Sequence, residues 1–327
     1  MSRSRIINRL IADIGGTHSR LALVSPGEGP THIATFKNKD FSDLACIIER
    51  YISNLEPAQL PRTAAFAVAC PITGDLIKLT NLDWEFSVSE YTSRFGLDKL
   101  HVINDFSAIA LAIPELKGDD LMQIGTGKAK TGHPIGVIGP GTGLGVAVLV
   151  SVADDWIPIA SEGGHVTLAA ASGREAGLIE LVREQFGHVS AERLLSGPGL
   201  AILYQALARS EGKSVEALDA PAVIRRARTQ EDPVAMETAD TFFAMLGTVA
   251  GNLALTLGAK GGIYLAGGIL PRISDMLLVS RFRESFLDKG RYRSYLETVP
   301  TYLITSEIPA FTGLQVYLRQ HFQHASE

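Results

Sequence analysis

Two glycine-rich segments, each set between apolar runs, are the residues of this chain best suited to hold an anion. The first is DIGGTHSR at 13–20, and the second is GPGTGLG at 139–145. Glycine lets a backbone turn sharply and approach an anion closely, so that consecutive N–H groups can point at phosphate oxygens. Thr17 and Thr142 could each add a hydroxyl donor. Together the segments predict a paired clamp for phosphates.

Each segment taken singly could also be a plain β-hairpin with a glycine turn. The shared layout of the two, and the acid Asp13 at the end of the first apolar run, favour the phosphate clamp. Neither segment continues into the Gly-Lys-Ser/Thr of a P-loop, and neither is the Gly-x-Gly-x-x-Gly that opens a helix after a strand. P-loop kinases and simple dinucleotide dehydrogenases are therefore disfavoured.

Asn104 and Asp105 follow an apolar strand at 101–103 and precede an apolar helical run at 106–113. An aspartate near its unperturbed pKa of about 3.9 is ionised at neutral pH, so it can accept a hydroxyl proton. Asp and Asn are also preferred helix N-caps. A general base and a cap both remain open here.

A second polar cluster is EGGH at 162–165, between apolar runs at 157–160 and 166–169. The two glycines let Glu162 and His165 face one ligand, where a carboxylate accepts from sugar hydroxyls and an imidazole donates or accepts. A metal site is disfavoured because no third ligand is near. An ordinary loop is the other alternative.

Two further positions are ambiguous in their local sequence. Glu192 reads as an acid in the first turn of a helix, where it would support the helix dipole. Gly267 and Gly268 end an apolar strand that begins at 262. Ligands sit at strand ends in open α/β sheets, but glycines there could equally serve a tight turn into a helix.

The elements that position these residues alternate between strand and helix. Strands are expected around both glycine turns, with the first beginning at residue 6, and at 32–36, 64–70 and 101–103; a helix is expected to open at 42–43. Alternation of this kind predicts α/β architecture with a largely parallel, helix-covered sheet. The second glycine segment starts a repeat of the first half's plan, so two related α/β lobes are expected.

Two helices stand out in the second half. Residues 172–187 carry one apolar stripe, which predicts a surface helix. Residues 240–258 are apolar on nearly all faces and hold Gly247 and Gly251, so a central helix approached closely by a neighbour is expected. The apolar part of that segment, 242–257, falls short of the ~20 residues that a membrane span needs.

Composition narrows the function classes. The 327 residues are 46% hydrophobic and 20% charged, with a net charge of -5. This balance is typical of a globular protein and gives no broad basic surface for nucleic acid or an anionic membrane. Cys46 and Cys70 are too few for a disulfide scaffold or a zinc site, and the N-terminal residues do not form a signal peptide. A cytoplasmic location is expected.

Taken together, these segments resemble the proteobacterial-type ATP-dependent glucokinases, within the actin, sugar kinase and Hsp70-like ATPase group. The likeness runs nearly end to end, and the order and spacing of its segments exclude chance. The cysteine and histidine zinc motif of the other large bacterial sugar kinase family is absent. The matching segments are 13–17, 70–75, 80–81 with Trp84, 103–106, 139–145, 162–165, 190–200, 251–255, 266–269 and 288–291.

The resemblance implies two α/β lobes of the ribonuclease H-like type, with an active-site cleft between them. It implies a smaller lobe of residues 1–114 with 306–327, closed by a C-terminal helix at about 313–321, and a larger lobe of residues 115–305. It further implies phosphorylation of glucose at the 6-hydroxyl by ATP, the step by which glucose enters glycolysis, and a homodimer.

The resemblance also implies a role for each site residue. Asp105 would take the proton from the 6-hydroxyl, and Mg²⁺ would sit mostly on phosphate oxygens and water, with Asp13 the best indirect contact. The other sugar hydroxyls would be bound by Asn104, Glu162, His165 and Glu192. Phosphates would be held by Asp13, Ile14, Gly15, Gly16 and Thr17 and by Gly141 and Thr142, and adenosine would pass Gly267 and Gly268.

Two other functions stay open on the sequence. A kinase for another hexose, such as mannose or an N-acetylhexosamine, would use the same plan. A non-enzymatic sugar sensor would usually carry a DNA-binding module, for which the start of the phosphate turn at Asp13 leaves no room upstream. His18 stands where the family usually has Asn, which puts its contact with phosphate or sugar in question.

Overall fold

The computed structural model describes residues 8–153 and 155–323, so the predicted start of the first strand at 6 lies outside the described residues. The chain divides into two compact units. Unit 1 is Met1–Leu116 with Glu307–Glu327, and unit 2 is Lys117–Ser306. The segment that begins at Glu307 therefore belongs to the same unit as the N-terminal segment Met1–Leu116.

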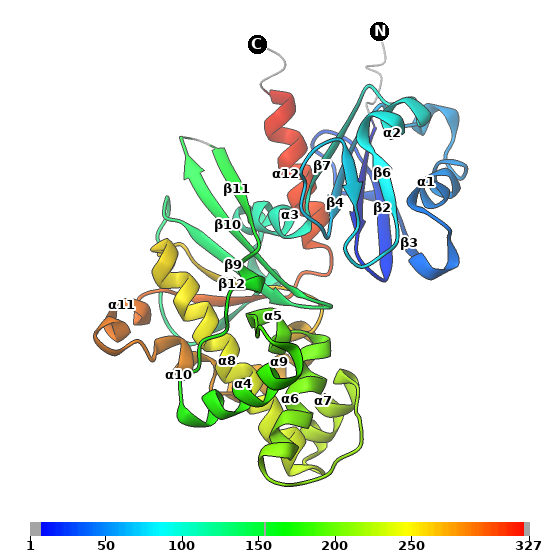
Figure 1. The fold of residues 1–327 in the computed structure, drawn as a ribbon. Helices are drawn as coiled ribbons and strands as arrows, with labels where there is room; N and C mark the ends of the chain where they lie inside the picture. The colour runs from blue at the N-terminus through cyan, green and yellow to red at the C-terminus, as the bar shows by residue number, and fades with distance from the viewer. Residues whose placement is uncertain (1–7, 154, 324–327) are drawn as a thin grey trace. The chain divides into compact units, whose positions relative to one another are not determined.

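Unit 1 is built on a five-stranded sheet in the order β3-β2-β1-β4-β7 (Figure 1). The strands β1, β2 and β3 form an antiparallel meander, and β4 and β7 run parallel to β1. The bounds are β1 (Arg9–Ile14), β2 (His18–Val24), β3 (Thr31–Lys37), β4 (Thr63–Val68) and β7 (Lys99–Asn104), with a small hairpin of β5 (Leu76–Lys78) and β6 (Glu85–Ser87).

Helices cover both faces of this sheet because its side chains alternate between them. Leu10, Ala12 and Ile14 of β1 pack in one cluster with α1, while Ile11 packs on the other face with α3 and α12. The helices are α1 (Leu44–Ile52), α2 (Val88–Arg94), α3 (Asp105–Ala112) and α12 (Pro309–Gln323). Asp43 caps α1, so the predicted opening at 42–43 is confirmed.

Unit 2 repeats the strand order of unit 1, which confirms the predicted duplication. Its sheet runs β11-β10-β9-β12-β13, with β8 added at the edge beside β13. The bounds are β8 (Leu121–Ile124), β9 (Ile135–Pro140), β10 (Leu144–Val152), β11 (Asp155–Ser161), β12 (Gly262–Leu265) and β13 (Thr301–Ile304).

The expectation of a largely parallel sheet is wrong, because both sheets are mixed. Among the described residues of unit 2, only the pairs β9–β12 and β12–β13 are parallel. The glycine turns are the reason: each joins two adjacent strands directly, and a direct turn can only give an antiparallel pair. Helical crossovers supply the parallel strands that follow.

The helices of unit 2 gather around α8 (Pro233–Leu257), which is buried along much of its length (Figure 1). A Cβ on Gly247 would lie 2.1 Å from the carbonyl oxygen of Phe282 in α10, so the predicted close approach is confirmed. The other bounds are α4 (Gly173–Phe186), α5 (Ala191–Leu194), α6 (Gly197–Ser210), α7 (Ala220–Thr229), α9 (Ser274–Val279), α10 (Phe282–Leu287) and α11 (Arg293–Glu297).

The central helix is longer than the sequence suggested. It begins seven residues before 240, at Pro233, because Asp232 caps it and proline suits the first helical position. By length and composition it could cross a membrane, but 61% of its most apolar stretch is buried inside the protein. The core of unit 2 therefore accounts for its apolar character.

Candidate functional site

The residues predicted to act in unit 1 lie at one edge of its sheet. Because β1, β4 and β7 are parallel, their carboxyl ends meet there: Ile14 is level with Val68, and Val68 with Asn104. The first glycine turn leaves β1 at this edge and Asp105 leaves β7. The fold thus brings the phosphate turn and the candidate base together.

The first turn is closed by its own backbone. The Gly15 N–H donates to the His18 carbonyl at 3.0 Å, so Gly15 shapes the turn instead of offering its N–H to a ligand. The N–H groups of Gly16 and Thr17 donate no hydrogen bond within residues 8–153 and 155–323. These two groups, with the exposed Thr17 hydroxyl, are what the turn can present to an anion. The His18 side chain is exposed.

Asn38, which the sequence analysis did not single out, fixes this turn through hydrogen bonds. Its Nδ2 donates to the Gly15 carbonyl at 2.7 Å, and its backbone N–H donates to Thr17 at 3.0 Å. Its Oδ1 accepts from the buried hydroxyl of Ser19 at 2.8 Å. Asn38 is itself 1% exposed. Nothing in the local sequence marks it, since its partners lie about twenty residues away.

Of the two roles left open at 104–105, Asn104 takes that of the helix cap and Asp105 keeps that of the candidate base. Asn104 is the N-cap of α3, and its Oδ1 accepts from the N–H groups of Phe106 and Ser107 at 3.0 and 3.1 Å. Its Nδ2 donates to Asp105 Oδ1 at 3.0 Å. Asp105 is the first helical residue, which leaves its carboxylate available for chemistry and held by its neighbour.

The surroundings of Asp105 make it a stronger base than an ordinary aspartate. Burial, followed by the nearby negative charge of Asp13, raises the pKa of Asp105 to about 7, against the lowering effect of the hydrogen bonds from Phe106 and Asn104. Burial also raises the pKa of Asp13, while Arg20 opposes that shift. A base whose pKa lies near the working pH is well placed for proton transfer.

The second glycine turn, in unit 2, is fixed by the segment that follows 190. The Gly141 N–H donates to the Gly143 carbonyl at 2.7 Å, and the Gly197 N–H donates to the Gly141 carbonyl at 2.8 Å. Glu192 Oε2 accepts from the Leu144 N–H at 2.8 Å. A Cβ on Gly143 would lie 2.4 Å from that oxygen, so the carboxylate lies directly against the turn. Glu192 therefore fixes the second turn, a role that its place in the first turn of a helix did not predict.

Gly267 and Gly268 lie beside this turn. Gly267 has φ +85°, and a Cβ there would lie 2.4 Å from the Pro140 carbonyl oxygen. No atom lies within 4 Å of a Cβ built on Gly268, so that residue borders open space. A short 3₁₀ helix follows, Leu270–Ile273. Gly267 thus serves tight packing, and Gly268 leaves open space after the end of the strand, so both alternatives drawn from the sequence hold in part.

Glu162, His165 and Glu192 form one cluster in unit 2. The 3₁₀ helix Gly163–His165 packs on β10, where a Cβ on Gly164 would lie 2.1 Å from the Leu144 carbonyl oxygen. His165 Nε2 lies 3.9 Å from Glu162 Oε2, and its Nδ1 lies 3.8 Å from Glu192 Oε1. Over the part of the chain that the structure describes, no group of three His, Cys, Asp or Glu side chains is arranged to hold a metal ion, this cluster included. The cluster suits a ligand with several hydroxyls.

Known proteins place the chain in one family. A sequence model described as Glucokinase matches residues 10–321. A glucokinase of Paramagnetospirillum magneticum is 47% identical over 306 residues, 93% of this chain and 95% of the relative.

Solved structures of other proteins share the fold of this chain. A glucokinase from an Antarctic psychrotroph matches with a TM-score of 0.86 and 40% identity, covering 96% of this chain and 99% of its own. A more distant glucokinase of the ROK family from Streptomyces griseus, solved with glucose and AMPPNP, shares the fold at a TM-score of 0.62 and 18% identity, covering 96% and 99%. The chain belongs to the glucokinase family.

Proposed function

We propose that the chain transfers the γ-phosphoryl group of ATP to the 6-hydroxyl of glucose, giving glucose 6-phosphate and ADP, the step that opens glycolysis. The observation that carries the proposal is the placement of Asp105, with its raised pKa, at the same sheet edge as the first glycine turn. Membership of the glucokinase family supports the choice of sugar, and the AMPPNP complex of the Streptomyces griseus protein supports the choice of donor.

In the proposed reaction the oxygen of the 6-hydroxyl attacks the γ-phosphorus while the bond from that phosphorus to the bridging oxygen of ADP breaks. The hydroxyl proton passes to the Asp105 carboxylate. Asn104 holds that carboxylate by the bond from its Nδ2, and it is the proposed ligand of another sugar hydroxyl. Most of the barrier reduction comes from positioning and charge stabilisation, and the base supplies about 10²–10⁴-fold.

The remaining residues hold the two substrates. In the turn from Asp13 to Thr17, which runs through Ile14 and Gly15, the N–H groups of Gly16 and Thr17 and the Thr17 hydroxyl bind phosphate. The turn at Gly141 and Thr142 binds phosphates too. Gly267 and Gly268 border adenosine, and the cluster of Glu162, His165 and Glu192 binds sugar hydroxyls. One carboxylate, that of Glu192, contacts both this cluster and the backbone of the second turn.

ATP is used as its Mg²⁺ complex in this proposal. Mg²⁺ keeps several waters and is bound by one or two carboxylates plus substrate phosphates. The chain fits that mode, because Asp13 offers a half-buried carboxylate at the phosphate turn. When bound, the ion neutralises charge on the phosphates.

We also propose lobes of residues 1–114 with 306–327 and of 115–305, a cytoplasmic location and a homodimer. The division of the chain into two compact units supports the lobes. The cytoplasmic location is expected from the composition of the chain. The homodimer is expected from the resemblance to the family.

A hexose panel tests the choice of sugar. A polar site rejects a sugar that lacks or inverts one hydroxyl, because its own groups are then left unpaired. We expect kcat/KM for glucose to exceed that for galactose and fructose by at least about 100-fold, as measured by coupled ADP release. Mannose and an N-acetylhexosamine complete the panel. A higher kcat/KM for either of these, or equal values throughout, would contradict glucose as the substrate.

The raised pKa of Asp105 predicts a pH dependence. The carboxylate must be ionised to accept a proton, and its pKa of about 7 lies above the ordinary value. We expect kcat/KM for glucose to fall as the pH drops below about 7, approaching tenfold per unit. Initial rates from pH 5.5 to 9 measure this, with the coupling enzymes in excess at each pH. A flat profile across that range would contradict the assignment.

A further inference from the structure

Asn81 lies at the tip of a hairpin that unit 1 holds against the first glycine turn. The strands β5 and β6 pair in antiparallel fashion, and Ile77 and Phe86 bury their side chains in the core. The Leu79 N–H donates to the Trp84 carbonyl at 3.0 Å, which closes the tip. The tip is thus anchored by its apolar residues.

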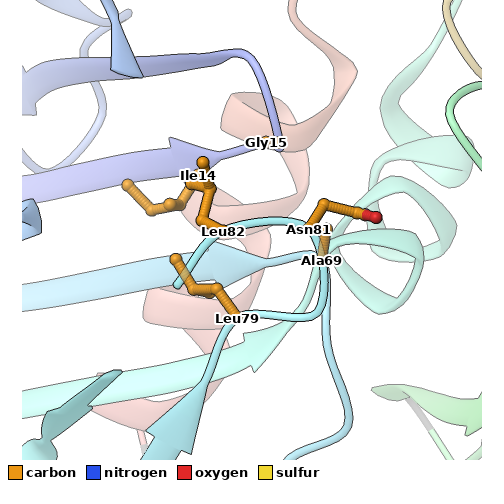
Figure 2. Close-up of a pocket in the computed structure, with 7 residues that line it drawn as sticks. Ile14, Gly15, Ala69, Leu79, Asn81 and Leu82 are labelled. Carbon is orange, nitrogen blue, oxygen red and sulfur yellow. The ribbon is translucent and has the colours of Figure 1, made fainter. Parts of the chain in front are cut away.

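The hairpin tip and the glycine turn are in van der Waals contact. Ile14, Gly15 and Gly16 line one shallow pocket together with Leu79, Asn81 and Leu82 (Figure 2). A Cβ built on Gly16 would lie 3.0 Å from the Cβ of Asn81, which is tighter than ordinary packing. Gly16 therefore allows Asn81 to sit directly beside the turn.

The amide of Asn81 is free to meet a ligand. In Figure 2 the side chains of Leu79 and Leu82 lie on one side of the tip, and the amide of Asn81 extends to the other. The side chain is exposed and makes no hydrogen bond within the described ranges. An amide beside two unoccupied backbone N–H groups, those of Gly16 and Thr17, adds a side-chain donor to the same anion site.

We propose that Asn81 binds the transferred phosphoryl group, by donating a hydrogen bond from Nδ2 to one of its equatorial oxygens. The inference rests on the proposed function, since it takes the first turn as the place of the γ-phosphate. Charge on the transferred group spreads over those oxygens in the transition state, so an added neutral donor stabilises it. ADP has no γ-phosphoryl group and makes no such contact.

Nucleotide binding by Asn81→Ala tests this contact without requiring turnover. We expect the Kd for MgAMPPNP, measured by calorimetry, to rise by about tenfold or more, as for a lost hydrogen bond to a charged group. The Kd values for MgADP and for glucose stay within about twofold of wild type. Asn81→Asp, which puts a carboxylate where the amide was, weakens MgAMPPNP further and also leaves glucose unchanged. Asp83→Ala, an exposed change on the same tip, leaves all three Kd values unchanged.

The possible failures are distinguishable. If wild-type protein binds both nucleotides and phosphorylates glucose, but Asn81→Ala weakens MgADP and MgAMPPNP equally or weakens glucose alone, the inference is overturned and the proposed function stands. Unchanged affinities in both variants overturn it as well. If wild-type protein binds neither nucleotide, both the proposed function and the inference are contradicted. Thermal melting of each variant checks that the fold is kept.

Discussion

Asp105→Asn should lower kcat by about 10²–10⁴-fold while glucose binding stays close to wild type. The amide has the shape of the carboxylate, so the cap that Asn104 provides for α3 and the start of that helix are kept. What is lost is the capacity to take the proton of the 6-hydroxyl. Single-turnover rates with saturating MgATP, together with glucose affinity from calorimetry, measure the two effects separately.

The control for this variant is Asp40→Asn, an exposed aspartate in the same unit that lies away from β7 and α3. It should keep wild-type kcat. Near-full kcat in Asp105→Asn with normal glucose affinity would remove Asp105 from its proposed role. Loss of glucose binding without loss of kcat would make it a sugar ligand only.

Gly313→Ala should strongly lower the free energy of unfolding. A Cβ at this position of α12 would lie 1.7 Å from the carbonyl oxygen of Ala108 in α3 and 2.5 Å from its carbonyl carbon. Backbone atoms cannot turn aside as a side chain can, so the two helices must separate. Overpacking of a core costs about 1–3 kcal/mol, and we expect the upper end of that range in the free energy of unfolding.

Gly177→Ala is the matched control, because Gly177 also lies inside a helix, α4, but no atom stands within 4 Å of its built Cβ. There alanine should leave the free energy of unfolding unchanged or raise it by up to about 1 kcal/mol. Urea unfolding compares the two variants. Equal stabilities for Gly313→Ala and Gly177→Ala would contradict the packing of α12 against α3.

The parts of the fold and site that could be predicted are those encoded within a few residues. The two glycine turns, the strand before Asn104 and the capped helix after Asp43 each carry a local signal, and all four are present. The repeat was also readable, because the same turn appears twice. The resemblance to glucokinases joined these local signals into one assignment.

The parts that could not be predicted depend on contacts between distant residues. Asn38 fixes the first turn from more than twenty residues away, and the carboxylate of Glu192 accepts the Leu144 N–H of the second turn. The antiparallel pairs at the two glycine turns were readable from the turns themselves, but the order of the other strands in each sheet was not. The early start of α8 is different, since Asp232 followed by Pro233 is a readable helix start.

The most direct test of the account is the identity of the product. Purified protein is incubated with MgATP and glucose, and ADP and the sugar phosphate are measured in the same sample by phosphorus NMR. We expect glucose 6-phosphate and ADP in equal amounts, with no ADP when glucose is left out. ADP release without a sugar phosphate, a phosphate on another hydroxyl, or no turnover at all would contradict it.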